Sequence, residues 1–516
     1  MATSITLPSG SETATAVPLP ILSHWVDGAP VEVLPEHTAP IYNPATGEVF
    51  ASVPRGGQAE VDRAVAAAKA AFPGWRDTPL IARSQVFFAF RGLVYRHREE
   101  MAALITRDHG KTFPDALGEV LRGLETIDFA CGLPSHLAGM NTPVVASNVD
   151  AQTLRGPLGV TAAITPFNFP AMVPMWIYPI ALMCGNTMVW KPSSHTPGAS
   201  QLQAELWKEA GGPDGTFNIV YGGREAVAAI VEHPDIRAIQ FVGSTAVGRY
   251  VFETGTHHGK RVGSFTSAKN AMIVLPDADM AMTADAAVAS GYGSAGERCM
   301  AQTLVIAVGD TADRLRPLIL ERIKGLKIGP GMEPGMDMGP IYTAEHRASV
   351  IEWIDKGVAE GAELVVDGRP FVHPTSPDGF FLGVSLFDHV TPEMQIYQEE
   401  IFGPVLGIVR ARTYDEAIGL INAHKYANGT AIFTADGGAA RRFKLEVDVP
   451  MIGVNVPIPV PAGYMSFGGA KESAIGDLAM RGEDGVRFFT QQKMVTERWP
   501  EPGRTGPLSL VFPGNS

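Results

Sequence analysis

Four β-rich runs decide the fold of this chain: G-V-T-A-A-I-T (159–165), N-T-M-V-W-K (186–191), T-F-N-I-V-Y (216–221) and I-R-A-I-Q-F-V (236–242). Helical patterns, such as those at 201–209 and 224–232, lie between them. Strands that alternate with helices predict a parallel sheet covered on both faces, with ligands bound at the carboxyl ends of the strands. We therefore expect a nucleotide site in this part of the chain.

A second alternating stretch covers residues 270–455 and predicts a second α/β domain. Its β-rich runs are A-M-I-V-L-P, T-L-V-I-A-V, E-L-V-V-D, G-P-V-L-G-I-V and G-T-A-I-F-T. Nearer the N-terminus, apolar residues at helical spacing predict a helix from Gln58 to Phe72 that ends before Pro73 and Gly74.

Composition excludes several classes of function. The chain has 516 residues, 45% hydrophobic and 18% charged, as expected for a soluble globular protein of two or three domains. A formal net charge of −13 argues against nucleic acid as a partner, because phosphate binding needs a basic face. The three cysteines, Cys131, Cys184 and Cys299, cannot form a disulfide framework and lack metal-ligand spacing. We expect a reducing compartment and no metal site.

The N-terminus and one apolar stretch bear on localisation. Residues 1–23 are rich in Ser, Thr and Pro and predict a loose arm. The first Lys or Arg is Arg55, so the start resembles neither a secretory signal nor a mitochondrial transit peptide, and we expect a cytoplasmic protein. The uncharged stretch 161–190 is long enough for a membrane helix, but its prolines and asparagines favour a buried strand, turn and helix.

The run S-A-G-E-R-C-M (294–300) supplies the best candidate nucleophile, Cys299, with Arg298 directly before it. A thiol among small residues and beside a fixed positive charge is expected to lose its proton near neutral pH and attack a carbonyl carbon. The alternative is a small buried apolar residue, which is the commoner role of a single cysteine. The motifs elsewhere in the chain favour the nucleophile.

Two candidates lie where predicted strands end. In F-V-G-S-T-A-V-G (241–248), Gly243 and Ser244 lie between a strand and a helix, where backbone N–H groups and the positive helix end suit a phosphate. Such a turn also needs small residues without any ligand. Lys191 ends a strand in V-W-K-P, where a ribose or phosphate is expected, although a lone lysine there is usually solvated. A G-x-G-x-x-G fingerprint after the first strand is missing, which argues against an ordinary Rossmann dehydrogenase.

Asn168 is a third candidate, because it is one of few amides in the apolar run I-T-P-F-N-F-P. A buried amide must find a partner, so Asn168 can donate to an oxyanion. The alternative is that it braces a loop between prolines.

Six motifs occur in an order and spacing that resembles the aldehyde dehydrogenase superfamily. They are I-T-P-F-N-F-P, V-W-K-P, G-S-T-x-x-G, the run around Cys299, E-E-I-F-G-P-V (399–405) and S-F-G-G (466–469). The resemblance covers residues 24–500. Within the superfamily, G-E-R-C-M, N-V-P-I-P-V-P (455–461), F-N-F-P-A-M-V-P and R-W-P (498–500) are most similar to the CoA-acylating methylmalonate-semialdehyde dehydrogenases.

The resemblance implies an α/β fold with a Rossmann-type cofactor domain, an α/β catalytic domain and a small β oligomerisation element. The nucleotide-binding domain would comprise residues 24–138 and 158–264, and the catalytic domain residues 265–484. The oligomerisation element would comprise 139–157 and 485–516, which include the C-terminal tail. By the resemblance, the chain would assemble as a homotetramer or a homodimer.

The resemblance also implies roles for individual residues. Cys299 would be the nucleophile, and Asn168 with the Cys299 backbone N–H would form the oxyanion hole. The nicotinamide cofactor would contact Thr165, Phe167, Lys191, Ser194, Gly243, Ser244, Thr266, Glu400 and Phe402, with Glu400 on the nicotinamide ribose. By the resemblance, NAD is the expected cofactor. Ser194 stands where NAD-preferring relatives usually carry a glutamate, and the loss of that carboxylate removes a repulsion against a 2′-phosphate, so NADP stays open.

A departure from the family pattern points to coenzyme A. The hydrolytic members carry a glutamate general base in E-L-G-G-K, and the aligned stretch here is F-T-S-A-K-N, which places Phe265 at that position. A phenyl ring cannot take a proton from water, so transfer of the acyl group to a thiol is expected. Because the paired glycines of E-L-G-G-K are also missing here, the resemblance does not predict the geometry of the loop at residues 265–267.

Two arginines indicate the substrate. By the resemblance, Arg298 and Arg122, the latter in G-E-V-L-R-G-L, would hold a carboxylate as a guanidinium pair. This implies oxidation of methylmalonate or malonate semialdehyde to propionyl-CoA or acetyl-CoA, with loss of carbon dioxide. Two alternatives stay open. One is a CoA-independent aldehyde dehydrogenase in which Glu297 or another group activates water, and the other is a catalytically silent nucleotide-binding protein.

Overall fold

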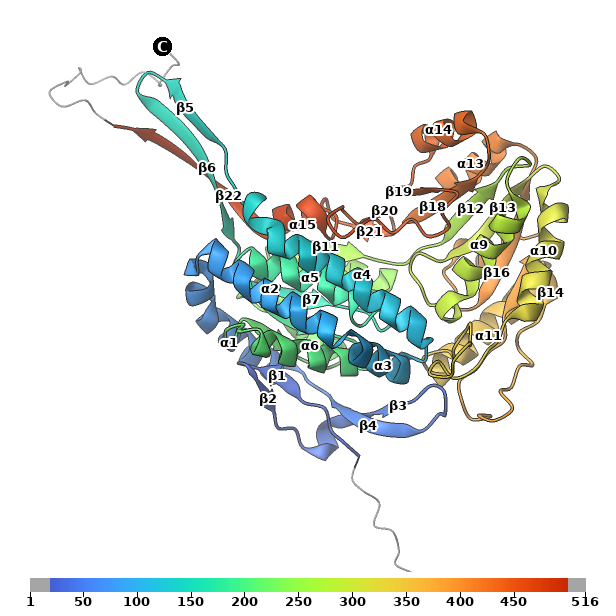
Figure 1. Ribbon diagram of the computed structural model, residues 1–516, viewed down its shortest axis with the longest axis horizontal. Helices are drawn as coiled ribbons and strands as arrows, with labels where there is room; N and C mark the ends of the chain where they lie inside the picture. The colour runs from blue at the N-terminus through green and yellow to red at the C-terminus, as the bar shows by residue number, and fades with distance from the viewer. Residues whose placement is uncertain (1–18, 500–516) are drawn as a thin grey trace, which may run out of the picture.

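The computed structural model describes residues 19–499, which form two α/β domains and a projecting β-sheet (Figure 1). Residues 1–18 of the predicted N-terminal arm and residues 500–516 of the predicted tail, Pro500 included, lie outside the described residues. Of the remaining arm residues, Leu22 donates its backbone N–H to the Ser52 carbonyl at 2.8 Å, so the arm is attached to the first domain at this point.

The first domain is built on an eight-stranded sheet with the order β2-β1-β9-β8-β7-β10-β11-β21. Its strands are β1 (His24–Val26), β2 (Ala29–Val31), β7 (Val160–Ile164), β8 (Thr187–Lys191), β9 (Phe217–Ile219), β10 (Ile236–Val242), β11 (Arg261–Phe265) and β21 (Ala474–Ile475). The five strands from β9 to β11 are parallel. The chain runs outward from β7 to β9 on one side and from β10 to β11 on the other. The strand order therefore reverses between β7 and β10, where open α/β sheets bind ligands.

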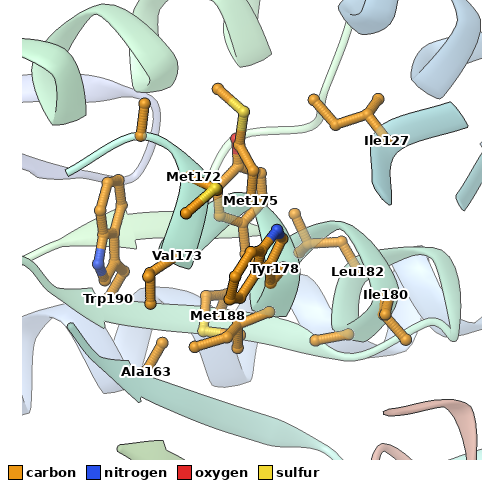
Figure 2. Packing of buried hydrophobic residues seen from close by; sticks show 14 of the residues in the cluster. Ile127, Ala163, Met172, Val173, Met175, Tyr178, Ile180, Leu182, Met188 and Trp190 are labelled. Atoms are coloured by element: carbon orange, nitrogen blue, oxygen red, sulfur yellow. The ribbon is translucent and has the colours of Figure 1, made fainter. Parts of the chain in front are cut away.

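Nine helices belong to this domain among the described residues. They are α1 (Gln58–Asp77), α2 (Leu80–Arg96), α3 (Arg98–His109), α4 (Phe113–Gly132), α5 (Met172–Met183), α6 (Gly198–Glu209), α7 (Arg224–Glu232), α8 (Thr245–His257) and α15 (Gly482–Phe488). Every residue of α5 is buried, because the helix lies between the sheet and α4. Figure 2 shows Val173 and Tyr178 of α5 near Met188 and Trp190 of the sheet. The apolar stretch 161–190 is thus a strand, a turn, a core helix and a strand, as predicted. No helix within residues 19–499 is long and apolar enough to cross a membrane.

The predicted end of the first helix is wrong. Helix α1 continues through Pro73 and Gly74 to Asp77. Trp75 explains the extension, because its buried indole donates Nε1–H to the Leu182 carbonyl at 2.8 Å. This tertiary anchor outweighs the backbone hydrogen bond that a proline removes from a helix.

The second domain has a seven-stranded sheet with the order β14-β15-β16-β13-β12-β18-β19 and its own hydrophobic core. Its strands are β12 (Asn270–Val274), β13 (Gln302–Val308), β14 (Glu363–Val366), β15 (Ser385–Asp388), β16 (Val405–Ala411), β18 (Gly429–Phe433) and β19 (Met451–Val454). Its helices are α9 (Met280–Tyr292), α10 (Thr311–Gly325), α11 (Ala344–Ala359), α12 (Gln395–Gln398), α13 (Tyr414–Ala423) and α14 (Gly437–Glu446). After β19 the chain returns to the first domain, where β21 pairs with β11.

Three smaller sheets complete the described structure. Strands β5 (Asn141–Ala146), β6 (Val149–Pro157) and β22 (Thr490–Arg498) form a three-stranded antiparallel sheet that extends away from both domains (Figure 1). It uses the two segments predicted for the oligomerisation element, except that α15 occupies residues up to Phe488. The other two are the hairpin β3 (Thr38–Tyr42) and β4 (Val49–Pro54), and the pair β17 (Tyr426–Ala427) and β20 (Ala470–Lys471).

Candidate active site

The candidate residues lie where the carboxyl edge of the first sheet meets the amino edge of the second. Thr165 follows β7, Lys191 ends β8 and Gly243 follows β10, whereas Cys299 precedes β13 and Glu400 precedes β16. Parallel strands place all their carboxyl ends at one edge, so residues far apart in sequence meet there.

Cys299 lies half-buried in a segment held by two asparagines of the second domain. Its backbone carbonyl accepts hydrogen bonds from Asn270 Nδ2 at 2.9 Å and from Asn428 Nδ2 at 3.0 Å. The preceding residues Ser294 and Ala295 have left-handed φ angles of 53° and 51°, a conformation that costs non-glycine residues energy and is typical of functional sites. The position of the thiol is therefore set by a strained turn and two side-chain amides.

The expectation that Arg298 acidifies the thiol is wrong for this structure. Burial, and to a lesser extent the charge of Glu400, raises the pKa of the Cys299 thiol to about 12. The Arg298 guanidinium does not offset this, because its Nη2 donates to Asp115 Oδ1 at 2.8 Å. It packs against Gly293, where an added Cβ would lie 2.5 Å from Arg298 Nη1. The adjacent positive charge is thus directed into an ion pair.

Arg122 lies at a separate place on α4. Its Nη1 donates to Glu125 Oε1 at 2.6 Å, and its Nη2 donates to the Val460 and Pro461 carbonyls at 3.0 and 2.9 Å. Arg122 and Arg298 thus have different partners in this structure, and their joint role on a substrate carboxylate stays a prediction.

Asn168 is held on both sides. Its Nδ2 donates to the Glu297 carbonyl at 2.9 Å, which ties it to the segment of Cys299, and its own carbonyl accepts from Lys111 Nζ at 2.5 Å. The Asn168 amide carries a second N–H, which is the group that an oxyanion would need.

A buried ion pair that the sequence analysis missed fixes the turn around Asn168. Lys111 Nζ lies 2.8 Å from Glu119 Oε2, and both side chains are 0% exposed. Glu119 Oε1 also accepts the backbone N–H groups of Ala171 and Met172, at 2.8 and 3.2 Å. One signal could have found the pair: Glu119 falls three residues after Ala116 and four before Gly123, on the buried stripe of its helix.

The contacts of the Glu297 side chain do not suit the role of water activation that the CoA-independent alternative assigns to it. Glu297 is fully buried, its Oε1 accepts the Tyr342 backbone N–H at 3.3 Å, and its Oε2 lies 3.4 Å from His109 Nε2. Burial raises the pKa of Glu297 well above its usual value and lowers that of His109 well below. The two side chains therefore form a neutral pair behind the Cys299 segment.

On the first domain, the predicted cofactor residues lie at the strand ends. Lys191 Nζ donates to the Pro192 and Gly222 carbonyls at 2.9 and 3.0 Å, and burial lowers its pKa to about 8. Thr165 donates its backbone N–H to the Lys191 carbonyl at 3.1 Å. Ser194 Oγ is buried without a partner among the described residues, as a group waiting for a ligand hydroxyl would be.

The predicted phosphate site is the N-terminus of α8. Ser244 is the N-cap residue of this thirteen-residue helix, and its side chain does not cap it. Gly243 donates its N–H to the Phe265 carbonyl at 3.1 Å, which joins the end of β10 to the end of β11. The positive end of α8 is therefore open to an anion.

The remaining cofactor candidates form contacts between the domains. Phe167 and Phe402 pack edge to face with ring centroids 5.8 Å apart, and Phe402 has a left-handed φ of 58°. Glu400 Oε1 accepts the Ala268 N–H at 3.0 Å, and burial raises the pKa of Glu400 to about 7. Thr266 donates its N–H to the Ser473 carbonyl at 2.9 Å, so the altered 265–267 loop is held by the returning C-terminal segment.

Phe265 is buried in the hydrophobic core of the first domain. It is the last residue of β11, beside Gly243, so the position expected for a carboxylate base holds an apolar ring. Nothing at this position can accept a proton from water.

Comparisons with known proteins agree with this arrangement. The sequence pattern of the aldehyde dehydrogenase family matches residues 33–495. The malonate-semialdehyde dehydrogenase of Pseudomonas aeruginosa is 48% identical, over 95% of this chain and 99% of its own length. The malonate-semialdehyde dehydrogenase 2 of Geobacillus kaustophilus is 46% identical, over 93% and 99%.

Solved structures show the same similarity. A protein of Sinorhizobium meliloti 1021 assigned as a methylmalonate-semialdehyde dehydrogenase, in complex with NAD, superposes with a TM-score of 0.93 at 46% identity, covering 94% of this chain and 99% of that one. The methylmalonate-semialdehyde dehydrogenase DddC of Oceanimonas doudoroffii gives 0.92 at 45% identity, over 94% and 99%.

Proposed function

Because the chain belongs to the aldehyde dehydrogenase family, we propose that it is an NAD-dependent, CoA-acylating semialdehyde dehydrogenase for malonate or methylmalonate semialdehyde. The observation that carries the CoA dependence is the buried ring of Phe265 where hydrolytic relatives have a base. The relatives named for malonate and methylmalonate semialdehydes, at 45 to 48% identity over nearly the whole chain, support the substrate class.

In the proposed reaction, the Cys299 sulfur adds to the aldehyde carbon, and its proton leaves. The oxygen that becomes negative would be held by Asn168 Nδ2 and the Cys299 backbone N–H, since Lys111 and the Glu297 carbonyl hold Asn168 in place. Bound NAD would supply the hydride acceptor for that carbon, and the acyl group would then remain on Cys299 as a thioester. The carboxylate of the acyl group then leaves as carbon dioxide, and the carbon that carried it takes up a proton. The thiol of coenzyme A, as it loses its own proton, attacks the thioester carbonyl and releases the Cys299 thiol, so the product is acetyl-CoA or propionyl-CoA.

The residues present fit a nicotinamide dinucleotide. The open α8 N-terminus after Ser244 suits the pyrophosphate, the unpartnered Ser194 Oγ suits a ribose hydroxyl, and Glu400 suits the ribose next to the nicotinamide. We propose that Thr165, Lys191 and Thr266 complete this site, with Phe167 and Phe402 at its reacting end.

Rapid mixing tests the proposed function. Without CoA, the thioester at Cys299 should accumulate, so reduced cofactor should appear as a burst of about one equivalent per active site, followed by a slow steady rate. Adding CoA should restore rapid turnover. The matched control is Cys299→Ala, which should show no burst yet bind NAD within a few fold of the wild type. Equal steady rates with and without CoA, with the free acid as product, would replace this proposal with the CoA-independent reaction.

The projecting sheet is the candidate contact surface between copies of this chain. The projecting sheet exposes Met140, Val144, Leu154, Met494 and Trp499, and apolar side chains in such a patch favour contact with another copy of the chain. We propose a homotetramer or homodimer formed through this sheet, which light scattering after gel filtration would measure. The three free cysteines fit a cytoplasmic enzyme.

A further inference from the structure

Arg481 is a buried arginine with no carboxylate partner among the described residues. It is 1% exposed, and its Nη2 donates to the Pro461 carbonyl at 2.6 Å. Its guanidinium lies over the Trp176 ring, 4.5 Å from the centroid, and 5.9 Å from that of Phe467. Two N–H donors of these side chains, Arg481 Nε and Trp176 Nε1, are buried and find no acceptor within residues 19–499. Buried donors without partners are rare and require an explanation.

Around Arg481, the positively charged side chains outnumber the negatively charged ones. Arg122 donates to the same Pro461 carbonyl at 2.9 Å, so two guanidinium groups meet at one oxygen. The charged groups that act on Arg481 are Arg122 and Glu125, and burial together with the Arg122 charge lowers the pKa of Arg481 to about 9. Glu125 is already engaged, since its Oε1 accepts from Arg122 and its Oε2 from the Gly463 N–H at 3.0 Å. One positive charge is left for an anion to neutralise.

The cluster lies beside the candidate active site. Trp176 is in α5, which starts four residues after Asn168. The Asn168 amide in turn donates to the Glu297 carbonyl, two residues before Cys299, and Arg122 of the cluster lies on α4, the helix whose Glu119 holds the turn after Asn168. Arg122 is the accessible member, with 37% of its side chain exposed, whereas Arg481 lies behind it.

We propose that Arg481 is a specificity-determining positioning residue, which acts through Arg122 to bind the carboxylate of the semialdehyde substrate. Arg122 contacts the carboxylate. Arg481 holds the Pro461 carbonyl on which Arg122 rests, and it places a second positive charge behind Arg122. This inference rests on the proposed function, and it adds a buried arginine behind Arg122.

The test compares a carboxylated with an uncharged aldehyde. In Arg481→Leu, KM for malonate semialdehyde should rise about tenfold more than KM for propanal, because a charge near the carboxylate is lost. Arg481→Lys should recover part of the difference, since it keeps the charge and loses the planar guanidinium. Both substrates are measured with saturating NAD and CoA, and kcat is reported separately from KM.

Glu125→Gln gives a prediction of opposite sign. It removes the single negative charge of the cluster and keeps an amide oxygen that can accept a hydrogen bond, so KM for malonate semialdehyde should fall by about twofold to fivefold. A purely structural role of the cluster would raise KM for both aldehydes in this variant. The KM values of Glu125→Gln therefore test the inference even if Arg481→Leu does not fold.

Equal changes for both aldehydes in the Arg481 variants, or a higher KM for malonate semialdehyde in Glu125→Gln, would overturn the inference. Failure of the proposed function has a different signature. The wild-type protein would then oxidise propanal and leave malonate semialdehyde untouched, or show turnover that does not depend on CoA.

Discussion

Replacing Lys111 by methionine would remove the positive member of the buried pair that holds the Asn168 turn. The change keeps the length of the side chain and deletes the charge, so Glu119 is left buried with only the Ala171 and Met172 N–H groups as partners. It also removes the hydrogen bond from Lys111 Nζ to the Asn168 carbonyl. We expect separate effects on stability and on catalysis.

The size of the stability loss can be worked from the burial of the pair. Breaking a buried pair by removing one partner costs about 3 to 5 kcal/mol, and the two remaining N–H bonds to Glu119 place this case near about 3 kcal/mol. For a domain of this size, that corresponds to a fall of about 6 to 12 °C in the thermal midpoint. Removing an oxyanion donor outright costs about a hundredfold or more in kcat, so a loosened Asn168 should cost about tenfold.

The double variant Lys111→Met with Glu119→Leu separates the two effects. Replacing both members of a buried pair by apolar residues is often neutral for stability, so the thermal midpoint should recover most of its loss. The kcat should not recover, because the Asn168 carbonyl still lacks its donor. Differential scanning calorimetry and steady-state assays with NAD and CoA measure the two quantities.

A surface pair provides the matched control. Lys69 lies 2.8 Å from Asp235, but 63% of the lysine side chain is exposed. Lys69→Met should therefore shift the midpoint by less than about 3 °C. The reasoning is refuted if the double variant is as unstable as Lys111→Met alone, or if its kcat returns to the wild-type value.

Three further predictions concern the thiol and the cofactor site. Because the pKa of Cys299 is raised to about 12, alkylation of the cofactor-free enzyme by iodoacetamide should accelerate about tenfold per pH unit from pH 7 to 9. A plateau below pH 8 would show an acidic thiol, and Cys299→Ala supplies the background. Burial raises the pKa of Glu400 to about 7, so its carboxylate, the form that accepts ribose hydroxyls, is lost as pH falls through 7. NAD affinity, followed by fluorescence titration, should therefore weaken from pH 8 to 6, and a pH-independent Kd would contradict this role. Ser194→Glu should lower the ratio of NADP to NAD use at least about tenfold, because a carboxylate repels the 2′-phosphate; an unchanged ratio in kcat/KM would place the 2′-position elsewhere.

Two α/β domains and membership of the family could be predicted from the order of residues alone. Strand and helix periodicity are local properties, so the runs from residue 159 to residue 242 predicted β7 to β10 with small errors at their ends. The family resemblance is confirmed, since the family pattern matches residues 33–495. The roles assigned to Cys299, Asn168 and Glu400 stay predictions, although the structure places all three where the two sheets meet.

Which charged side chains meet, and which are buried, depends on contacts between distant parts of the chain. Arg298 and Asp115 are 183 residues apart in the chain, and Lys111 and Asn168 are 57 apart, so no local pattern pairs them. The pKa of Cys299 followed burial and not the arginine beside it, because desolvation depends on packing around the sulfur. Arg481 passed unnoticed for the same reason. A guanidinium without a counter-charge is visible only when the fold shows what surrounds it.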